Sequence, residues 1–176
     1  MKKEEAIFAG GCFWCIEAVF NQIQGVESAI SGYIGGMRPN PSYEQVCTGA
    51  TGHAEAVKVR FDSEKISYEQ LLNIFFAIHD PTQLNRQGND IGTQYRSAIF
   101  YLNAQQKQQA TQKLIEIQPH FIEKVVTELT EATTFYPAEN YHQGYFLQNP
   151  NKGYCQLVVA PKFLKAKLQF ETLWKS

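Results

Sequence analysis

This 176-residue sequence lacks long apolar runs and an excess of charge of one sign. No hydrophobic stretch approaches the roughly 20 residues that a helix needs to cross a bilayer, which excludes a transmembrane helix. Sixteen Lys and Arg against 17 Asp and Glu give a net charge of −1, so no long-range attraction to nucleic acid or anionic membranes is expected. The charged start MKKEE leads directly into a predicted strand and does not resemble a signal peptide, so we expect a cytoplasmic protein.

Cysteine is also scarce, and the sequence shows neither internal repeats nor a linker. The four cysteines are expected to be free thiols in a cytoplasmic protein. Hydrophobic residues at 44% and charged residues at 19% are ordinary for a globular protein, and the length allows a sizeable core. We therefore expect one domain over residues 1–176, with a loop-rich C-terminal segment at 135–160 and a terminal helix at 161–175.

The hydrophobic pattern predicts alternating strands and helices. The order of the predicted elements is that of a split βαβ unit. We therefore expect an α/β (α+β) two-layer sandwich with a ferredoxin-like core, a mixed and mostly antiparallel sheet, and long functional loops. The predicted strands are 3–8, 25–34, 54–61, 97–102 and 124–131; helices begin at 16, 68, 104 and 161; and the long loops are 37–52, 82–95 and 135–151.

The stretch Ala9 to Cys15 is the first candidate for chemistry. Gly10 and Gly11 permit a tight turn from a strand into a helix, which places Cys12 at or just before the helix N-terminus. Unpaired backbone N–H groups and the helix dipole favour a thiolate there, and a thiolate is the nucleophilic form of cysteine. A buried structural cysteine is the competing interpretation, but the Cys-x-x-Cys spacing with Cys15 favours redox chemistry or metal binding.

Glu55 is the second candidate, because it lies on the apolar side of a predicted strand. A buried carboxyl group has a raised pKa, which makes it a proton donor near neutral pH. If Glu55 lies beside Cys12, the two residues form a nucleophile and a general acid. If Glu55 instead lies at a strand end and reaches water, it has no such role.

Four blocks of the sequence resemble, in order, the A type of peptide methionine sulfoxide reductase. The blocks are GGCFWCIE, NPSYEQVCTGATGHAEAVKVRFD, HDPTQLNRQGNDIGTQYRSAIFY and YHQGYFLQNPNKGYC, and the similarity extends from Ala9 to about Pro161. Members of this family reduce the S epimer of methionine sulfoxide, free or in proteins, to methionine. The resemblance therefore implies an enzyme, a thiol-dependent oxidoreductase of protein repair under oxidative stress.

The resemblance also implies a role for each matching residue. Cys12 attacks the sulfoxide sulfur, and Glu55 protonates the sulfoxide oxygen. The remaining roles are hydrogen bonding of the same oxygen by Tyr43 and Tyr95, completion of the polar floor by Asp90, and an apolar wall for the ε-methyl group made of Phe13 and Trp14. A chemical reason supports this set, since the oxygen must be protonated before it leaves as water, and hydroxyl donors polarise the S–O bond.

Attack leaves a sulfenic acid on Cys12, which a second thiol converts to a disulfide. By similarity Cys155 is the favoured resolving residue, and Cys15, one helical turn from Cys12, is the alternative. Cys47 is expected to be structural. The resemblance implies that thioredoxin reduces the disulfide, and that no metal or organic cofactor is required.

The residues alone leave other classes of function possible. A thioredoxin-like disulfide oxidoreductase would also use Cys12 and Cys15, but it would not need Glu55. A cysteine hydrolase would need a histidine base, for which His53 and His142 are candidates. A zinc site would need a second paired motif, which the other cysteines do not supply. A non-catalytic pocket for methionine-like side chains is the remaining alternative.

Overall fold

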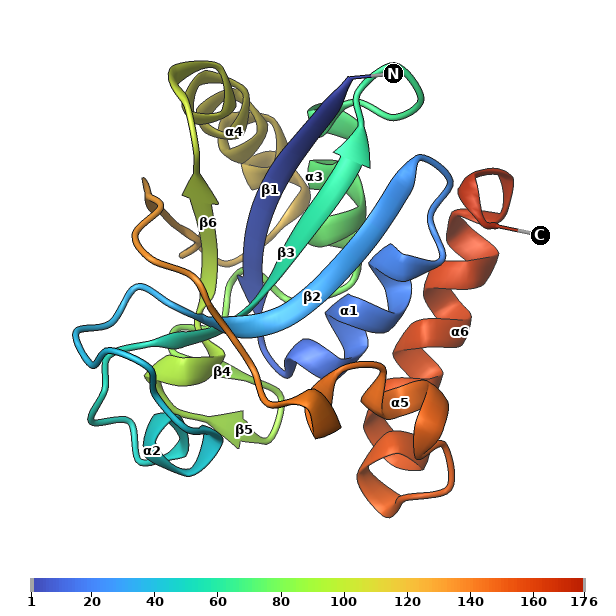
Figure 1. Ribbon diagram of the computed structural model, residues 1–176. Coiled ribbons are helices and arrows are strands. Elements are labelled where there is room, and N and C mark those ends of the chain that lie inside the picture. Colours follow the sequence, from blue (N-terminus) through green and yellow to red (C-terminus); the bar gives the residue numbers. More distant parts are fainter. Residues whose placement is uncertain (1, 176) are drawn as a thin grey trace.

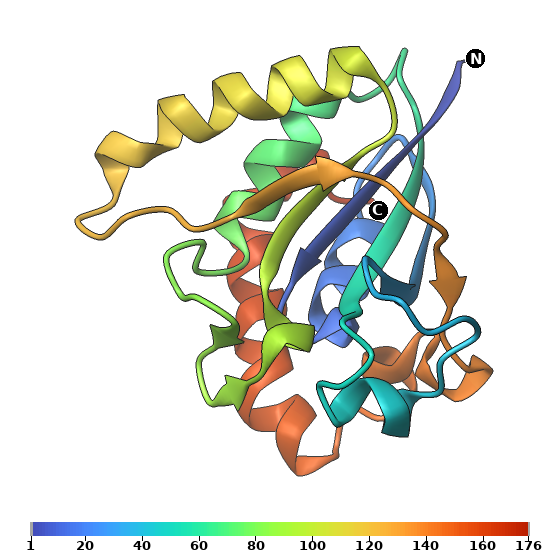
Figure 2. The same cartoon turned by 90° about the vertical axis from the view of Figure 1, so that its left-hand side faces the viewer.

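The computed structural model describes residues 2–175 and contains a six-stranded sheet with helices packed against one face (Figures 1 and 2). Its strand order is β7-β6-β1-β3-β2-β8, and β6–β7 is the parallel pair in an otherwise antiparallel sheet. The predicted two-layer sandwich with a mixed, mostly antiparallel sheet is thereby confirmed. The six strands are β1 (Lys3–Gly10), β2 (Val26–Ile34), β3 (Ala54–Asp62), β6 (Ser97–Tyr101), β7 (Glu128–Glu131) and β8 (Tyr136–Pro137).

The centre of the sheet has the ferredoxin-like arrangement expected from the element order. Helix α1 (Phe13–Asn21) connects β1 to β2, and helix α3 (Tyr68–Ala77) lies between β3 and β6. The four central strands lie in the order β6-β1-β3-β2, which is the fourth, first, third and second strand of the split βαβ unit. This order places the C-terminal end of β1 and the start of β3 close together, because the two strands are antiparallel neighbours.

The remaining elements are short, apart from two helices. Helix α4 packs against α3 and β6, and α6 packs against α1. A two-stranded hairpin lies in the second long loop. These elements are α2 (Tyr43–Cys47), the hairpin β4 (Arg86–Gln87) and β5 (Asp90–Ile91), a 3-10 turn at Thr93–Tyr95, α4 (Ala104–Ile117), 3-10 turns at Gln118–His120 and Asn140–His142, α5 (Tyr145–Gln148), a π-helix at Cys155–Val159, α6 (Ala160–Gln169) and a 3-10 turn at Glu171–Leu173.

Alternation along β1 divides the core into two parts. Phe8 points to the helical face, where it stacks on Phe20 of α1 at 5.6 Å and on Phe75 of α3 at 5.0 Å between ring centroids. Ile7 and Ala9 point to the opposite face, which the segment after β7 covers. This segment crosses the front of the sheet in Figure 1. Because successive side chains of a strand point to opposite faces, β1 contributes apolar side chains to the core on both sides of the sheet.

One predicted loop, one predicted strand and the terminal helix differ from the sequence-based expectation. The loop at 37–52 contains α2, because Ser42 and Gln45 form a capping box. The strand predicted from residue 124 begins only at Glu128. The terminal helix does not begin at Pro161, since helical backbone already starts at Gly153 and passes through the π-helix. Proline is compatible with the first turn of a helix, but here it follows an earlier turn.

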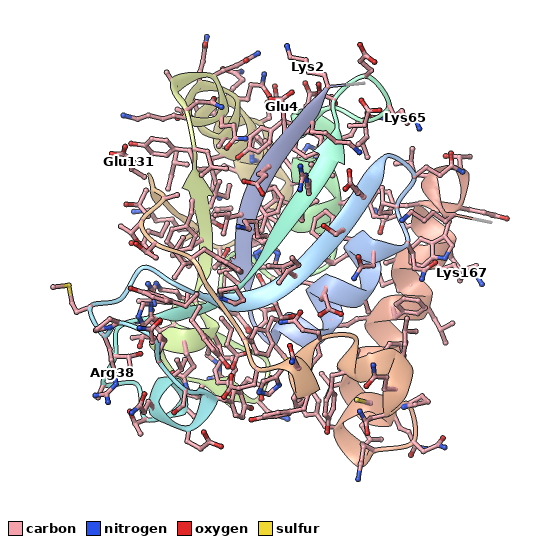
Figure 3. The ribbon with its side chains drawn as sticks, viewed as in Figure 1. Lys2, Glu4, Arg38, Lys65, Glu131 and Lys167 are labelled. Atoms are coloured by element: carbon pink, nitrogen blue, oxygen red, sulfur yellow. The ribbon has the colours of Figure 1, made fainter. Side chains whose placement is uncertain are left out.

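The C-terminal residues are joined to the end of α1. Ile23 and Trp174 form an antiparallel bridge, the backbone N–H of Gln24 donates to Leu173 O at 2.7 Å, and that of Lys175 donates to Gln22 O at 2.7 Å. The charged side chains labelled in Figure 3, Lys167 among them, lie at the rim of the molecule. Within residues 2–175, none of the helices is both long enough and apolar enough to cross a lipid bilayer.

Candidate active site

Cys12 lies between β1 and α1, where it is the N-cap residue of α1 and is half-buried. The turn needs the two preceding glycines. Gly11 has φ +94°, in the left-handed region, and a Cβ atom on Gly10 would lie 2.9 Å from the His79 ring. The predicted placement of this cysteine at the start of a helix is confirmed.

The predicted thiolate is wrong for the resting protein, because the pKa of Cys12 lies well above its ordinary value. Burial is the largest cause, and the negative charge of Glu55 is the second. Hydrogen bonds from the Trp14 backbone and with the Tyr154 side chain lower the pKa of Cys12, but they do not outweigh these two effects. Cys12 therefore rests as a thiol, although it lies at a helix N-terminus.

Glu55 is the second residue of β3 and is 1% exposed, so the prediction that its carboxyl group is buried holds. Its Oε1 accepts a hydrogen bond from the backbone N–H of Phe13 at 3.3 Å. Its Oε2 has no hydrogen-bond partner among the described residues. Burial raises the pKa of Glu55 to about 8; the Phe13 hydrogen bond opposes this rise, and the charge of Asp90 adds to it. The group is consequently a carboxylic acid at neutral pH, with one oxygen available to a ligand.

Tyr43 and Tyr95 lie around the same carboxyl group. Tyr43 is in the first turn of α2, where its backbone N–H donates to Glu139 at 2.9 Å, and Tyr95 ends the 3-10 turn before β6. Burial raises the pKa of both phenols, and the charge of Glu55 is the next cause in each case. Both tyrosines therefore keep their hydroxyl protons and can act as donors near Glu55.

Phe13 and Trp14 form an aromatic cluster beside Cys12. Phe13 is fully buried and packs on Tyr43 at 6.4 Å and on His142 at 5.2 Å between ring centroids. Trp14 is half-buried and stacks on Tyr145, with centroids 3.9 Å apart. Since Phe13 has no exposed surface, Trp14 is the member of the predicted pair that presents apolar surface in the resting protein.

His142 fixes the indole of Trp14, a contact that the sequence did not reveal. The indole Nε1–H donates to His142 Nδ1 at 3.0 Å, so the neutral imidazole carries its proton on Nε2. His142 is 1% exposed, and its Nε2 has no partner among the described residues. Burial lowers the pKa of His142, which keeps the ring neutral and able to accept the indole hydrogen bond.

Asp90 has a partner that the sequence analysis missed. The Tyr154 hydroxyl donates a short hydrogen bond to Asp90 Oδ2, and it lies within hydrogen-bonding reach of the Cys12 sulfur, so that it can donate to the thiolate when Cys12 ionises. The Tyr154 ring contacts Trp14 edge-on, with centroids 5.7 Å apart. The position of Tyr154 directly before a candidate resolving cysteine is the one sequence signal that could have drawn attention to it.

The other cysteines occupy different environments, and all four are free thiols. Cys15 is 4% exposed and Cys155 is fully buried, and both belong to one apolar cluster with Ala18 and Phe146. Burial raises the pKa of Cys15 to about 11 and also raises that of Cys155. Cys47 is exposed at the end of α2. Cys155 was expected in a loop-rich segment at 135–160, but it begins the π-helix.

His53 does not have the freedom that a hydrolytic base requires. Its Nδ1 accepts from the Gly36 backbone N–H at 3.0 Å, and its Nε2 lies 2.7 Å from Arg38 O. Both ring nitrogens therefore hold the loop before α2 in place. His53 is a structural residue in this fold.

Comparison with known proteins agrees with this geometry. The family model for peptide methionine sulfoxide reductase matches residues 4–173. The chain belongs to the peptide methionine sulfoxide reductase family. A relative from Pasteurella multocida (strain Pm70), peptide methionine sulfoxide reductase MsrA, is 68% identical over 172 residues, which cover 98% of this chain and 99% of the relative.

Two solved structures of the family extend the comparison. Mxr1 from Saccharomyces cerevisiae in its reduced form has a TM-score of 0.81 and 34% identity, over 88% of this chain and 90% of Mxr1. Mxr1 in complex with Trx2 has a TM-score of 0.58 and 25% identity, over 82% of this chain and 85% of that chain. Membership of this enzyme family confirms the resemblance inferred from the four sequence blocks.

Proposed function

We propose that this protein reduces methionine-S-sulfoxide, free and in proteins, to methionine, with Cys12 as the nucleophile and Glu55 as the general acid. The observation that carries the proposal is the position of Glu55. Its carboxyl group has a pKa of about 8 and one unpartnered oxygen, and it accepts a hydrogen bond from the residue directly after Cys12. An acid with a pKa near the working pH is suited to proton transfer.

The raised pKa values of both groups suggest how the protons move. Glu55 donates its proton to the sulfoxide oxygen, which Tyr43 and Tyr95 polarise by hydrogen bonding. The resulting carboxylate accepts the proton of the Cys12 thiol as the sulfur attacks the substrate sulfur. As the S–S bond forms, the S–O bond breaks and the protonated oxygen leaves as hydroxide. Its return to the Cys12 sulfur forms a new S–O bond and breaks the S–S bond, so that Cys12 becomes a sulfenic acid and methionine leaves. Glu55 regains its protonated state in the course of this step.

The aromatic cluster gives the site its preference for one epimer. We place the ε-methyl group of the substrate against Trp14 with Phe13 beneath, and the oxygen on the side of Glu55. When the methyl group lies on the apolar wall and the oxygen lies beside Glu55, only one of the two epimers can direct its sulfur toward Cys12. Asp90 completes the polar side of the site, where its carboxylate can accept a hydrogen bond from the substrate amide.

A second thiol and an external dithiol complete the cycle. Cys155 attacks the sulfenic acid to give a Cys12–Cys155 disulfide and water, with Cys15 as the alternative resolving thiol. The contact of the neighbouring Tyr154 with Cys12 supports Cys155. A thioredoxin then reduces the disulfide by exchange, in keeping with the Mxr1–Trx2 complex of the yeast relative. The net reaction converts methionine sulfoxide and a dithiol to methionine, a disulfide and water, and we propose no cofactor.

The remaining expectations fit this cycle. We propose a cytoplasmic location, where free thiols and thioredoxin persist. We also propose that residues 1–176 act as one catalytic domain. Residues from the two ends of the described chain meet at the site, as the contact between Cys12 and Tyr154 illustrates, which supports this view.

The test is a single turnover without reductant. Reduced protein is mixed with one equivalent of N-acetyl-methionine sulfoxide as the separate S and R epimers, methionine is quantified, and disulfides are mapped by mass spectrometry. We expect methionine from the S epimer only, together with a disulfide that contains Cys12. Cys12→Ser should form none. Cys47→Ser changes an exposed thiol and leaves a hydroxyl that can bond Tyr43 in its place, so it should retain the reaction. Methionine formation by Cys12→Ser would reject the nucleophile assignment.

A further inference from the structure

The geometry points to Tyr154 as a positioning residue that holds Cys155 away from Cys12 until substrate occupies the site. This inference rests on the proposed roles of Cys12 and Cys155. Under this inference Tyr154 sets the order of two steps. Cys12 first reduces the sulfoxide, and only then does Cys155 approach the sulfenic acid.

Tyr154 contacts three groups of the proposed substrate site. Its hydroxyl donates to the Asp90 carboxylate and lies within hydrogen-bonding reach of the Cys12 sulfur. Its ring lies edge-on against Trp14, at 5.7 Å and 78°. A methionine sulfoxide side chain needs the same Cys12 sulfur for reaction, the same Trp14 face for its methyl group and the same Asp90 carboxylate for its amide. Substrate and the Tyr154 hydroxyl therefore compete for one position.

Tyr154 and Cys155 cannot both face Cys12. Tyr154 has helical backbone angles, φ −60° and ψ −43°, so the side chains of these consecutive residues project about 100° apart. With Tyr154 against Cys12, Cys155 is directed into the apolar cluster that contains Ala18 and Phe146. A disulfide needs Cα atoms within about 4.4–6.8 Å and facing Cβ atoms. The start of the helix must therefore turn or unwind before Cys155 can reach Cys12, and Tyr154 must then leave.

The backbone at this point is suited to such a change. Residues Cys155–Val159 form a π-helix, a rare arrangement that occurs mostly as single turns and often at functional sites. The residue before Tyr154 is Gly153, which is exposed; a Cβ atom added to it would meet no atom of the described residues within 4 Å. The hydrogen bond of Tyr154 to Asp90 and its contact with Cys12 hold the start of this helix against the site, and loss of these contacts would release it.

The test measures how accessible Cys155 is. In a protein with Cys12→Ser, Cys15→Ser and Cys47→Ser, the remaining thiol is Cys155, and its alkylation by iodoacetamide is followed with and without saturating N-acetyl-methionine-S-sulfoxide. We expect the ligand to accelerate alkylation about tenfold, because it displaces hydrogen bonds to a charged group. Tyr154→Phe should accelerate alkylation similarly without ligand, and ligand should then add little. Asp90→Ala breaks the same contact from the other side and should act like Tyr154→Phe.

Controls separate this inference from a structural effect and from the proposed function. Tyr145→Phe is the matched variant, since Tyr145 also packs on Trp14 but its hydroxyl bonds neither Asp90 nor Cys12; it should leave the alkylation rate unchanged. In protein that retains Cys12, Tyr154→Phe should also shift the alkylation of Cys12 to higher pH, because the Tyr154 hydrogen bond lowers the pKa of Cys12. Failure of the wild-type chain to form methionine would reject the proposed function. Methionine formation together with an unchanged Cys155 rate in Tyr154→Phe, in Asp90→Ala or with bound ligand would overturn this inference alone.

Discussion

The carboxyl group of Glu55 is bonded to the backbone of Phe13, with 3.3 Å between Oε1 and the amide nitrogen. This bond joins the first turn of α1 to the start of β3, two segments that are 42 residues apart in the sequence. One of the free N–H groups at the helix N-terminus is therefore used to orient the acid, and the oxygen that has no partner among the described residues is left for substrate. The orientation of the proposed acid and the position of the proposed nucleophile thus depend on the same turn.

Glu55→Gln should slow methionine formation by about 10²–10⁴-fold, the range for loss of a general acid. The amide keeps the shape of the side chain but cannot donate the proton. In the wild-type protein, the rate of the first turnover should fall as pH rises through about 8, because Glu55 then ionises and its charge also raises the pKa of Cys12. Stopped-flow single-turnover rates from about pH 6 to 10 measure both effects. An unchanged rate in Glu55→Gln, or a flat profile, contradicts the assignment.

Glu55→Gln should also stabilise the fold. The folded-state pKa of about 8 lies above the ordinary value of 4.5, so below pH 4.5 the group is protonated in both states and has no effect. Between pH 4.5 and 8 only the unfolded state releases the proton, and the wild-type protein loses stability. At pH 7 the difference amounts to about 3 kcal/mol in favour of the variant. Urea unfolding at pH 4.5 and pH 7 should show the gap opening with pH; a variant less stable than wild type at pH 7 contradicts the buried-acid account.

The two buried cysteines should behave differently after one turnover. Cys155→Ser should stop at a sulfenic acid on Cys12 that dimedone labels, whereas Cys15→Ser should form the disulfide and cycle with thioredoxin. The reason is that Cys155 directly follows Tyr154, the residue that contacts the Cys12 thiol. Peptide mass mapping identifies the linked thiols. Continued cycling by Cys155→Ser would assign the resolving role to Cys15.

Trp14→Phe should weaken substrate binding more than it slows chemistry. The variant loses the hydrogen bond to His142 and part of the stack on Tyr145, which together correspond to roughly a tenfold rise in KM. A loss of binding shared by ground state and transition state leaves kcat largely unchanged. Trp174→Phe is the control, because Trp174 packs on Phe163 beside the C-terminus. A large fall in kcat with constant KM would show that Trp14 does not form the binding wall.

Much of the fold followed from local patterns, and the exceptions have physical causes. The segment SYEQ occurs twice, at 42–45 and 67–70, and both copies form capping boxes. Only the second was predicted to begin a helix, because an apolar helical repeat follows it, whereas Cys47 is followed by a turn. A capping box indicates where a helix begins and does not indicate how long it continues.

The site shows the same division between local and tertiary information. The turn around Cys12 and the burial of Glu55 could be predicted from spacing and alternation. The raised pKa of Cys12 could not, because the helix N-terminus is a local effect, and burial and the charge of Glu55 arise from packing. Tyr154 and the contact of His142 with Trp14 could not be predicted for a related reason, since each residue meets the N-terminal segment across more than 120 residues of sequence.

The pairing of Trp174 with Ile23 places Trp174 and Lys175 beside the end of α1. Helix α1 has nine residues, so its far end lies about 13 Å from Cys12, the proposed nucleophile. A purification tag or fluorescent domain fused at the C-terminus would thus leave on the side away from the reacting sulfur. Oxidised polypeptides and the reducing partner could still approach the other end, which makes this terminus the suitable point for labelling or immobilisation.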